Sequence, residues 1–270
     1  MLEVQELTKV FGTFTAVDHV SFDAHGGEIF GLLGPNGAGK TTTIRVIATI
    51  LGATSGTATV LGHDIHTDPE GVRRSIGVLT AEIGLYDRFT ARENMRYFGN
   101  LYGMSGPKLE QRIDELVHVL DMERFADRRA GSFSTGMKQK VAIARSIIHD
   151  PQVIIFDEPT AGLDVLASQT VIAYMKDAKA KGKLVVLSTH DMAHAQALCD
   201  RVAIIHRSKL LSLGTTQALL EKTHASTLEQ AFLNIVGEDA ALQTERDREE
   251  RHLADAAKKK RRRFGLRFRL

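Results

Sequence analysis

The chain has 270 residues, of which 43% are hydrophobic and 25% charged, values typical of a globular protein with enough length to bury a core. Its single cysteine, Cys199, excludes an intrachain disulfide, and no apolar run approaches the roughly 18 residues that a membrane helix requires. The net charge is +2, but residues 258–270 hold eight basic and no acidic side chains, so subtracting eight leaves −6 on residues 1–257.

The N-terminal portion has Glu3, Glu6 and Lys9 where a signal peptide would need an apolar stretch. We therefore expect a protein of the reducing cytoplasm, with Cys199 as a small core residue. From Leu2 to Phe22 the apolar spacing is nearer two, which predicts an antiparallel β portion.

After this portion, short apolar strands alternate with helices, which predicts an α/β fold with a largely parallel sheet. The clearest strands are apolar runs bounded by Gly or polar residues, as expected for strands buried on both faces: Ile29–Leu33, Val153–Phe156, Leu184–Leu187 and Val202–Ile205.

The first of these strands leads into GPNGAGKTT, which fits the phosphate-binding loop. Its glycines allow successive backbone N–H groups to surround phosphate oxygens. Lys40 is expected to reach the β- and γ-phosphates and act in catalysis, and the Thr41 hydroxyl to bind Mg²⁺. The alternative is a glycine-rich turn before a helix, which the flanking strand and the apolar-periodic helix disfavour. We expect the whole loop to contact ATP: Gly34, Pro35, Asn36, Gly37, Ala38, Gly39, Lys40, Thr41 and Thr42.

Strand signals stop between about residues 85 and 148, which predicts a helical subdomain inserted between the halves of the α/β core. Thr90 with Glu93 three residues later forms a capping box that predicts a helix through Leu101. The segment KLEQRIDELVHVL places apolar residues on one helical face: Leu109, Ile113, Leu116, Val117 and Leu120.

The stretch SFSTGMKQKVAIAR, residues 132–145, places small polar residues directly ahead of a basic helix. Ser134 at a helix start can cap a backbone N–H, and the same N–H groups, with the positive end of the helix dipole, can bind an anion. Alone, the stretch favours the cap. The phosphate loop elsewhere in the chain favours the anion site.

The sequence VIIFDEP places Asp157 at the carboxyl end of a buried strand, where α/β sheets bind their ligands. We expect Asp157 to hold Mg²⁺ through water and Glu158 to orient the attacking water as a base. His190 follows the strand KLVVLST and is expected to donate to the γ-phosphate. A metal pair of His190 and His194 is the alternative, but Asp191 stands where the metalloprotease pattern requires Glu.

Together these motifs resemble the ATP-binding subunits of ABC transporters over roughly residues 1–237. The phosphate loop, Asp157-Glu158, AGLD at 161–164 and His190 follow the family's order, and FSTGM at 133–137 stands where LSGGQ is usual. The resemblance implies a homodimer packed head to tail, in which Ser134 and the N–H of Gly136 contact the γ-phosphate on the partner's phosphate loop. It also implies that Phe11 in TKVFG stacks on adenine, with a core phenylalanine as the alternative.

Two features depart from the family pattern. Phe133, Thr135 and Met137 replace the usual Leu, Gly and Gln of the signature. Ala81 stands where a glutamine usually links magnesium to the helical subdomain, and Glu82 is the nearest polar substitute as a metal ligand. The segments LTAEIGLYDRFT, MKQKVAIAR and TLEQAFLNIVG resemble bacterial sodium-extrusion (NatA-type) and related exporter ATPases.

The resemblance therefore implies the ATPase motor subunit of an exporter at the cytoplasmic face of the inner membrane. Its permease would lie on a separate chain, and its cargo would be sodium or a drug-like or lipid molecule. The alternative is a soluble ABC-type ATPase that acts on nucleic acid or ribosomes, but such proteins usually carry two cassettes or a long coiled-coil insertion. A regulatory module without turnover is disfavoured because Lys40, Asp157, Glu158 and His190 are all present.

Polar and charged residues dominate beyond Gly237, so we expect an ABC domain over residues 1–237 and a disordered basic tail over residues 238–270. Two hypotheses for this tail stay open. It is either a solvated charged end or a segment that binds an anionic membrane surface and inserts Phe264 and Phe268. Nucleic-acid binding is the weaker hypothesis, because the acidic body offers no extended basic face.

Overall fold

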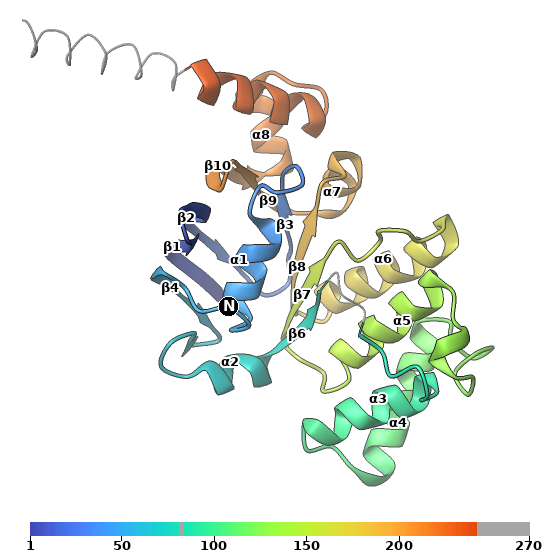
Figure 1. Ribbon diagram of the computed structural model, residues 1–270. Coiled ribbons are helices and arrows are strands. Elements are labelled where there is room, and N and C mark those ends of the chain that lie inside the picture. Colours follow the sequence, from blue (N-terminus) through green and yellow to red (C-terminus); the bar gives the residue numbers. More distant parts are fainter. Residues whose placement is uncertain (81–83, 242–270) are drawn as a thin grey trace, which may run out of the picture.

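The computed structural model describes residues 1–80 and 84–241, which form two sheets with helices around them (Figure 1). The N-terminal sheet has the strand order β2-β1-β4-β5 and is antiparallel throughout, which confirms the antiparallel portion expected from the spacing of Leu2–Phe22. Its strands are β1 (Leu2–Phe11), β2 (Phe14–Ala24), β4 (Ser55–Val60) and β5 (His63–Asp64).

The second sheet has six strands in the order β10-β9-β3-β8-β7-β6, and all but the edge strand β10 pair in parallel. This arrangement confirms the predicted α/β fold, and the four predicted strands differ from the observed ones by at most two residues at an end. The strands are β3 (Ile29–Leu33), β6 (Ile76–Leu79), β7 (Val153–Asp157), β8 (Leu184–Thr189), β9 (Arg201–His206) and β10 (Lys209–Thr215).

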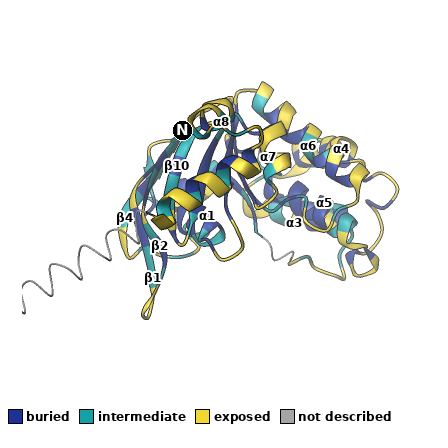
Figure 2. Ribbon diagram, turned by 90° about the horizontal axis from the view of Figure 1, so that it is seen from above, coloured by how far each residue is buried: buried dark blue, intermediate teal, exposed yellow. Residues whose placement is uncertain are grey.

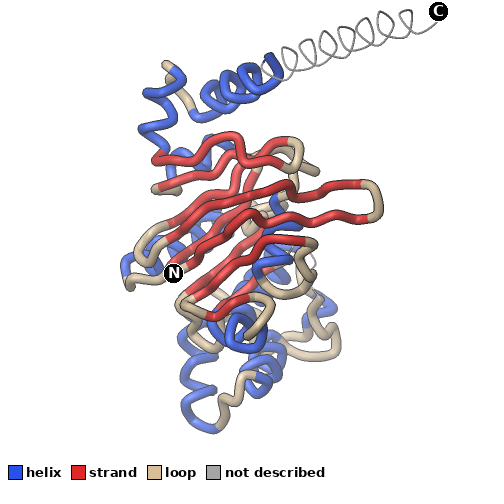
Figure 3. The backbone as a smooth tube through the Cα atoms, turned by 90° about the vertical axis from the view of Figure 1, so that its left-hand side faces the viewer, coloured by secondary structure: helices blue, strands red, loops and turns tan. Residues whose placement is uncertain are grey.

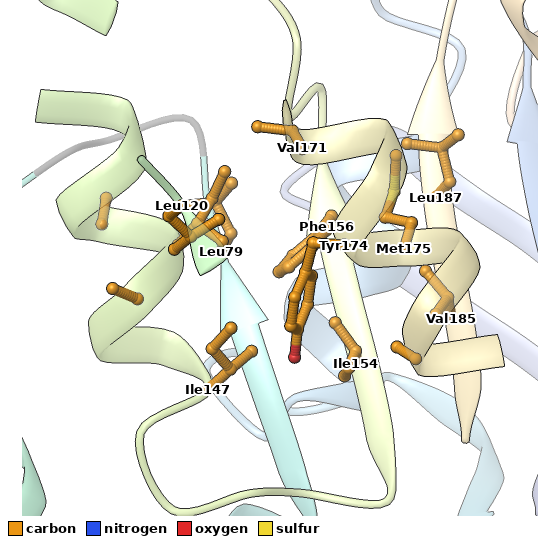
Figure 4. Close-up of a cluster of buried hydrophobic side chains, with 14 of the residues drawn as sticks. Leu79, Leu120, Ile147, Ile154, Phe156, Val171, Tyr174, Met175, Val185 and Leu187 are labelled. Atoms are coloured by element: carbon orange, nitrogen blue, oxygen red, sulfur yellow. The ribbon is translucent and has the colours of Figure 1, made fainter. Parts of the chain in front are cut away.

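Alternate residues of the central strands enter two different cores, as the two-residue period of a strand requires. Phe30 and Leu32 of β3 share a core with helix α1 (Lys40–Ile47) and the antiparallel sheet, so α1 lies between the two sheets (Figure 1). Figure 3 shows the strands of the sheets in red and the helices in blue. Ile29 and Leu33 face the opposite core, which the other helices cover. In that second core, Phe156 of β7 packs against Tyr174 of α6 (Val165–Ala180), with 6.5 Å between the ring centroids (Figure 4).

The helical block lies on this second core and contains α3 (Ala91–Leu101), α4 (Gly106–Val119), the short 3₁₀ helix η1 (Ala130–Ser132) and α5 (Thr135–Ser146). The capping box is present: Thr90 Oγ1 accepts from Glu93 N at 3.1 Å, and Glu93 Oε2 accepts from Thr90 N at 2.8 Å. All five apolar residues of the predicted α4 face are buried. The remaining helices are α2 (Pro69–Ser75), α6 (Val165–Ala180), α7 (Met192–Leu198) and α8 (Thr216–Thr223).

The described part of the chain ends in a helix over residues 228–241, which extends four residues past the expected domain boundary at Gly237. It is anchored by Leu228, Ala231 and Ile235, which are buried, while the outward faces of the peripheral helices are exposed (Figure 2). Residues 242–270 of the expected tail lie outside the described residues. Within the part described, no helix has both the length and the apolar character needed to cross a membrane.

Cys199 is buried beside α7, and burial raises the pKa of its thiol to about 12. The thiolate is therefore suppressed at neutral pH, and the expectation of a small core residue is confirmed.

Candidate nucleotide-hydrolysis site

The phosphate loop connects the buried strand β3 to α1 and requires glycine at two of its positions. At Gly39 the backbone φ is 110°, and a Cβ would collide with the carbonyl oxygen of Ala16. At Gly34 a Cβ would collide with the carbonyl oxygen of Ile205 on β9. The loop therefore takes its shape because these positions lack side chains, which leaves its backbone open to an approaching anion.

Lys40 lies at the first position of α1 and is only 5% exposed. Its Nζ donates to the carbonyl oxygens of Gly34 at 2.7 Å and Pro35 at 3.2 Å, so the ammonium is held across the loop. Burial lowers the pKa of Lys40, and the nearby carboxylates of Glu158 and Asp157 oppose this shift. The carbonyl oxygens and carboxylates around the Lys40 ammonium favour its charged form. A bound phosphate could take over this role.

Asp157 and Thr41, two of the three predicted magnesium ligands, lie side by side at the carboxyl edge of the parallel sheet. Thr41 Oγ1 donates to Asp157 Oδ2 at 2.8 Å, and Ser188 Oγ donates to the other oxygen, Asp157 Oδ1. Asp157 is 1% exposed. A hydroxyl and an orientated carboxylate side by side are hard oxygen donors of the kind that Mg²⁺ binds, so the residues present fit this ion.

Glu158 follows directly in a backbone conformation that is rare for a side chain of its size, with φ at 51°. Its N–H donates to the carbonyl oxygen of Ser188 at 3.2 Å, which ties the turn to β8. The carboxylate points into the site: Glu158 Oε1 lies 2.9 Å from His190 Nδ1 and 3.8 Å from Lys40 Nζ. A carboxylate so placed between an imidazole and an ammonium has both its orientation and its negative charge supported, as the expected role of a base requires.

Two residues that the sequence did not single out belong to this site. A cavity of about 240 Å³ over the loop is lined by Phe14, Ala16, residues 36–42 and Glu158, and we call it the phosphate-loop cavity. Phe14 is an exposed aromatic three residues after Phe11, so the FGTF sequence offered two candidates for an adenine contact. Ser188 carries no motif, and its role depends on its register opposite Asp157.

Phe11 does not line the phosphate-loop cavity, as far as the described residues define it. It is 45% exposed and pairs with Phe14 across the β1–β2 hairpin, with Lys9 Nζ 5.0 Å from its ring centroid. Exposure rules out the alternative of a core phenylalanine. Stacking on adenine stays a prediction.

The signature residues lie on a different cavity, of about 640 Å³, which shares no lining residue with the phosphate-loop cavity among the described residues. We call it the signature cavity. Its lining includes Ser134, Gly136, Met137 and Asp164, the last residue of AGLD. Ser134 caps α5 by accepting from Met137 N at 3.3 Å, and Asp164 caps α6 by accepting from Ala167 N at 2.8 Å. One chain therefore does not bring Ser134 and Gly136 to its own phosphate loop.

Glu82 and Ala81 lie outside the described residues, so the proposed metal contact of Glu82 has no structural account. The neighbouring Gly84 is held by α5, because the guanidinium of Arg145 donates to its carbonyl oxygen.

The fold and the site define a phosphate-loop nucleoside-triphosphatase: a glycine-shaped anion cradle, a buried cation and an acid pair meet at one edge of a parallel sheet. Sequence comparison places the chain within this class. A sequence model of the ABC transporter family matches residues 17–161, and the chain belongs to that family of ATP-binding, ATP-hydrolysing proteins.

Individual relatives agree with this assignment. The chain is 44% identical over 220 residues to the ABC transporter ATP-binding protein NatA of Bacillus subtilis (strain 168), covering 81% of this chain and 89% of that protein. It is 38% identical over 221 residues to a Nod factor export ATP-binding protein I of Rhizobium sp. (strain N33), covering 82% and 73%.

A solved structure supports the fold. A dimeric ATP-binding cassette in a post-hydrolysis state, bound to ADP and Pi, matches with a TM-score of 0.73 and 27% identity. The match covers 80% of this chain and 98% of that one.

Proposed function

We propose that the chain is the ATP-hydrolysing motor subunit of an exporter and that two copies pack head to tail around ATP. The observation that carries this proposal is Gly136. It lies in the first turn of α5, its φ is not positive, and a Cβ there would meet only Leu163 Cδ2 at an ordinary 3.6 Å. Its own chain does not require glycine at this position, whereas close approach of a phosphate held by a second subunit would require it.

Within each composite site, we assign the chemistry to the residues of the phosphate-loop side. Mg²⁺, when bound by Thr41 and Asp157, neutralises phosphate charge. Glu158 takes a proton from the water that attacks the γ-phosphorus while the bond to the β–γ bridging oxygen breaks. His190 holds the Glu158 carboxylate in place through the 2.9 Å contact, and the expected donation from His190 to the γ-phosphate stays a prediction. Ser134 and the backbone of Gly136, from the other subunit, add donors at the γ-phosphate.

An apolar groove supports the proposal of a membrane-spanning partner on another chain. The groove has a volume of about 230 Å³, and its lining includes Ile50, Val78, Phe98 and Tyr102, with Arg73 and Arg145 among the lining residues. Beside it, the exposed rings of Tyr86 and Tyr97 pack edge to face at 5.0 Å. Apolar side chains with two basic neighbours suit a short amphipathic helix that carries an acidic residue.

We propose a peripheral position at the cytoplasmic face of the membrane, and export as the direction of transport. The name of the Nod factor relative supports export. The cargo we propose is sodium or a drug-like or lipid molecule. The second candidate, a soluble ATPase for nucleic acid or ribosomes, would require a basic face, and residues 1–257 carry −6 after the tail is subtracted.

The head-to-tail arrangement is tested by mixing two inactive variants, Lys40→Ala and Ser134→Arg. Each homodimer has one damaged half in every composite site, so we expect no hydrolysis. In a mixed dimer, one site combines the intact Lys40 of one subunit with the intact Ser134 of the other, and ATP hydrolysis should partly return. If mixed dimers form around ATP and activity stays absent, the assignment of the signature residues is wrong.

The membrane partner is tested by co-purification from membranes. Ile50→Glu and Tyr102→Glu should release the chain from its hydrophobic partner, while Leu233→Glu, a change at an exposed leucine of the last helix, should not. Co-purification with nucleic acid in place of a membrane protein would favour the second candidate function.

A further inference from the structure

Gln139 is a buried amide on the signature helix α5, five residues after Ser134 and only 6% exposed. Its Nε2 donates to the carbonyl oxygen of Pro159 at 3.0 Å, across 20 residues of chain. Pro159 is itself buried and directly follows Glu158. The helix that presents the signature is thus bonded to the turn that presents the catalytic base of the same subunit.

The Glu158–Pro159 turn needs such support. Glu158 has a φ of 51°, and proline at the next position restricts the backbone conformations that Glu158 can adopt. The structure holds the turn from two sides: β8 accepts the N–H of Glu158 through the Ser188 carbonyl at 3.2 Å, and α5 donates to Pro159. Gln139 belongs to a part of α5 that is buried, together with the apolar run Val141–Ala144. Its amide therefore supplies a hydrogen-bond donor to Pro159 in the interior of the protein.

We propose that Gln139 is a positioning residue for hydrolysis, which holds the Glu158–Pro159 turn so that the carboxylate faces Lys40 and the phosphate-loop cavity. Gln139 contacts neither nucleotide nor reacting atoms and acts through the turn. One consequence of this proposal rests on the proposed head-to-tail dimer. There, α5 of a subunit closes over the partner's ATP while its Gln139 sets the base of its own site, so this hydrogen bond links the two sites.

The first test compares Gln139→Met, which keeps the length and lacks a donor, with Gln139→Glu, whose carboxylate repels the Pro159 carbonyl. A base displaced by about 1 Å costs on the order of 10²-fold in rate, so we expect kcat to fall by roughly 10- to 100-fold, more for Glu than for Met. The KM for ATP should stay unchanged, because the phosphate loop is untouched. Gln111→Met, an exposed glutamine of α4, serves as the matched control.

Thermal unfolding separates positioning from folding. Met is close to Gln in size and carries no polar group that burial would leave unpaired, so Gln139→Met should stay folded and bind a non-hydrolysable ATP analogue as the unsubstituted protein does. An unchanged kcat in this folded variant, or a raised KM at constant kcat, would overturn the proposal.

The second test places Gln139→Met in one subunit of the mixed dimer. In the Ser134→Arg subunit, which supplies Lys40 and Glu158 to the intact site, it should lower turnover as in the homodimer. In the Lys40→Ala subunit, which supplies the intact Ser134, it should leave turnover near the reference value. Equal losses of turnover for the two placements of Gln139→Met, or a loss only when it is in the Lys40→Ala subunit, would contradict the proposal. An inactive reference pair would instead contradict the head-to-tail dimer, and the homodimer kinetics would still decide the role of Gln139.

Discussion

Replacing Glu158 with glutamine changes one charge at the centre of the site and almost nothing else. The amide would keep the size of the side chain that lies between His190 at 2.9 Å and Lys40 at 3.8 Å, and it would lack the basicity to accept a proton from water. ATP binding should not weaken, because Lys40 keeps its bonds to Gly34 and Pro35 and one negative charge leaves the surroundings of the phosphates.

The expected loss lies in the chemical step. A positioned general base contributes about 10²- to 10⁴-fold, so the glutamine variant should turn over ATP 10²- to 10⁴-fold more slowly, an increase of roughly 3–5 kcal/mol in activation free energy. In the proposed mechanism the base acts after two subunits have closed around ATP, so the variant should accumulate as an ATP-bound dimer.

Phosphate release measures turnover, nucleotide titration measures affinity, and size-exclusion chromatography with ATP measures the dimer. Glu229→Gln is the matched control, because Glu229 is exposed on the last helix, far along the chain from the site residues. A near-normal rate in Glu158→Gln would mean that another group is the base. A loss of ATP binding would mean that the carboxylate is needed to hold the loop.

Three further predictions concern Gly136, His149 and the basic tail. Gly136→Ala should leave the free energy of unfolding unchanged or raise it by up to about 1 kcal/mol, because alanine is the better helix former and its Cβ has room. ATPase activity should fall, and unchanged activity would contradict the proposal that a phosphate approaches Gly136 closely. His149→Phe tests a half-buried imidazole whose ring centroid lies 3.6 Å from that of Tyr102 in a stacked arrangement, and whose pKa burial lowers to about 4. The unfolded chain takes up a proton on this imidazole near pH 6.5, whereas the folded chain does so only near pH 4. The unsubstituted protein should therefore lose stability relative to the variant, by at most about 3 kcal/mol, as pH falls from 6.5 to 4. Urea unfolding measures this difference, and parallel curves of stability against pH for the two proteins would contradict the prediction. Removal of residues 242–270 should leave nucleotide binding intact and weaken salt-sensitive binding to vesicles that contain anionic lipid; equal vesicle binding would leave only the solvated-tail hypothesis.

The central strands were predictable because burial on both faces demands continuous apolar runs, and β3, β7, β8 and β9 are such runs. Strand β6 was missed, since Ile76–Leu79 is four residues long and includes a glycine. Strand β10 was missed because an edge strand exposes one side and tolerates the polar residues of KLLSLGT. Length and burial thus decide which strands a sequence reveals.

The same distinction applies within the site. Lys40, Thr41 and Asp157 carry motif spacing, and the parallel sheet brings them to one edge, as expected from strand ends alone. Ser188 and Gln139 have no motif because their roles depend on tertiary contacts: Ser188 lies opposite Asp157 in register, and Gln139 of α5 reaches Pro159 in the turn that follows β7. Partners that are fixed by tertiary packing leave no local pattern to find.

The signature residues support the proposal that a second subunit contributes to this site. The sequence left a helix cap and an anion site as alternatives for Ser134, and the structure contains the cap, at 3.3 Å from Met137 N. A cap, however, does not require Gly136, which has space for a side chain, nor does it require the signature cavity to remain open beside Ser134. A glycine without a local reason, beside an open cavity at a helix start, indicates that what needs the space comes from outside the chain. The cap and the anion site are then compatible, because the Ser134 hydroxyl that accepts from Met137 N can still donate its own proton to a phosphate oxygen.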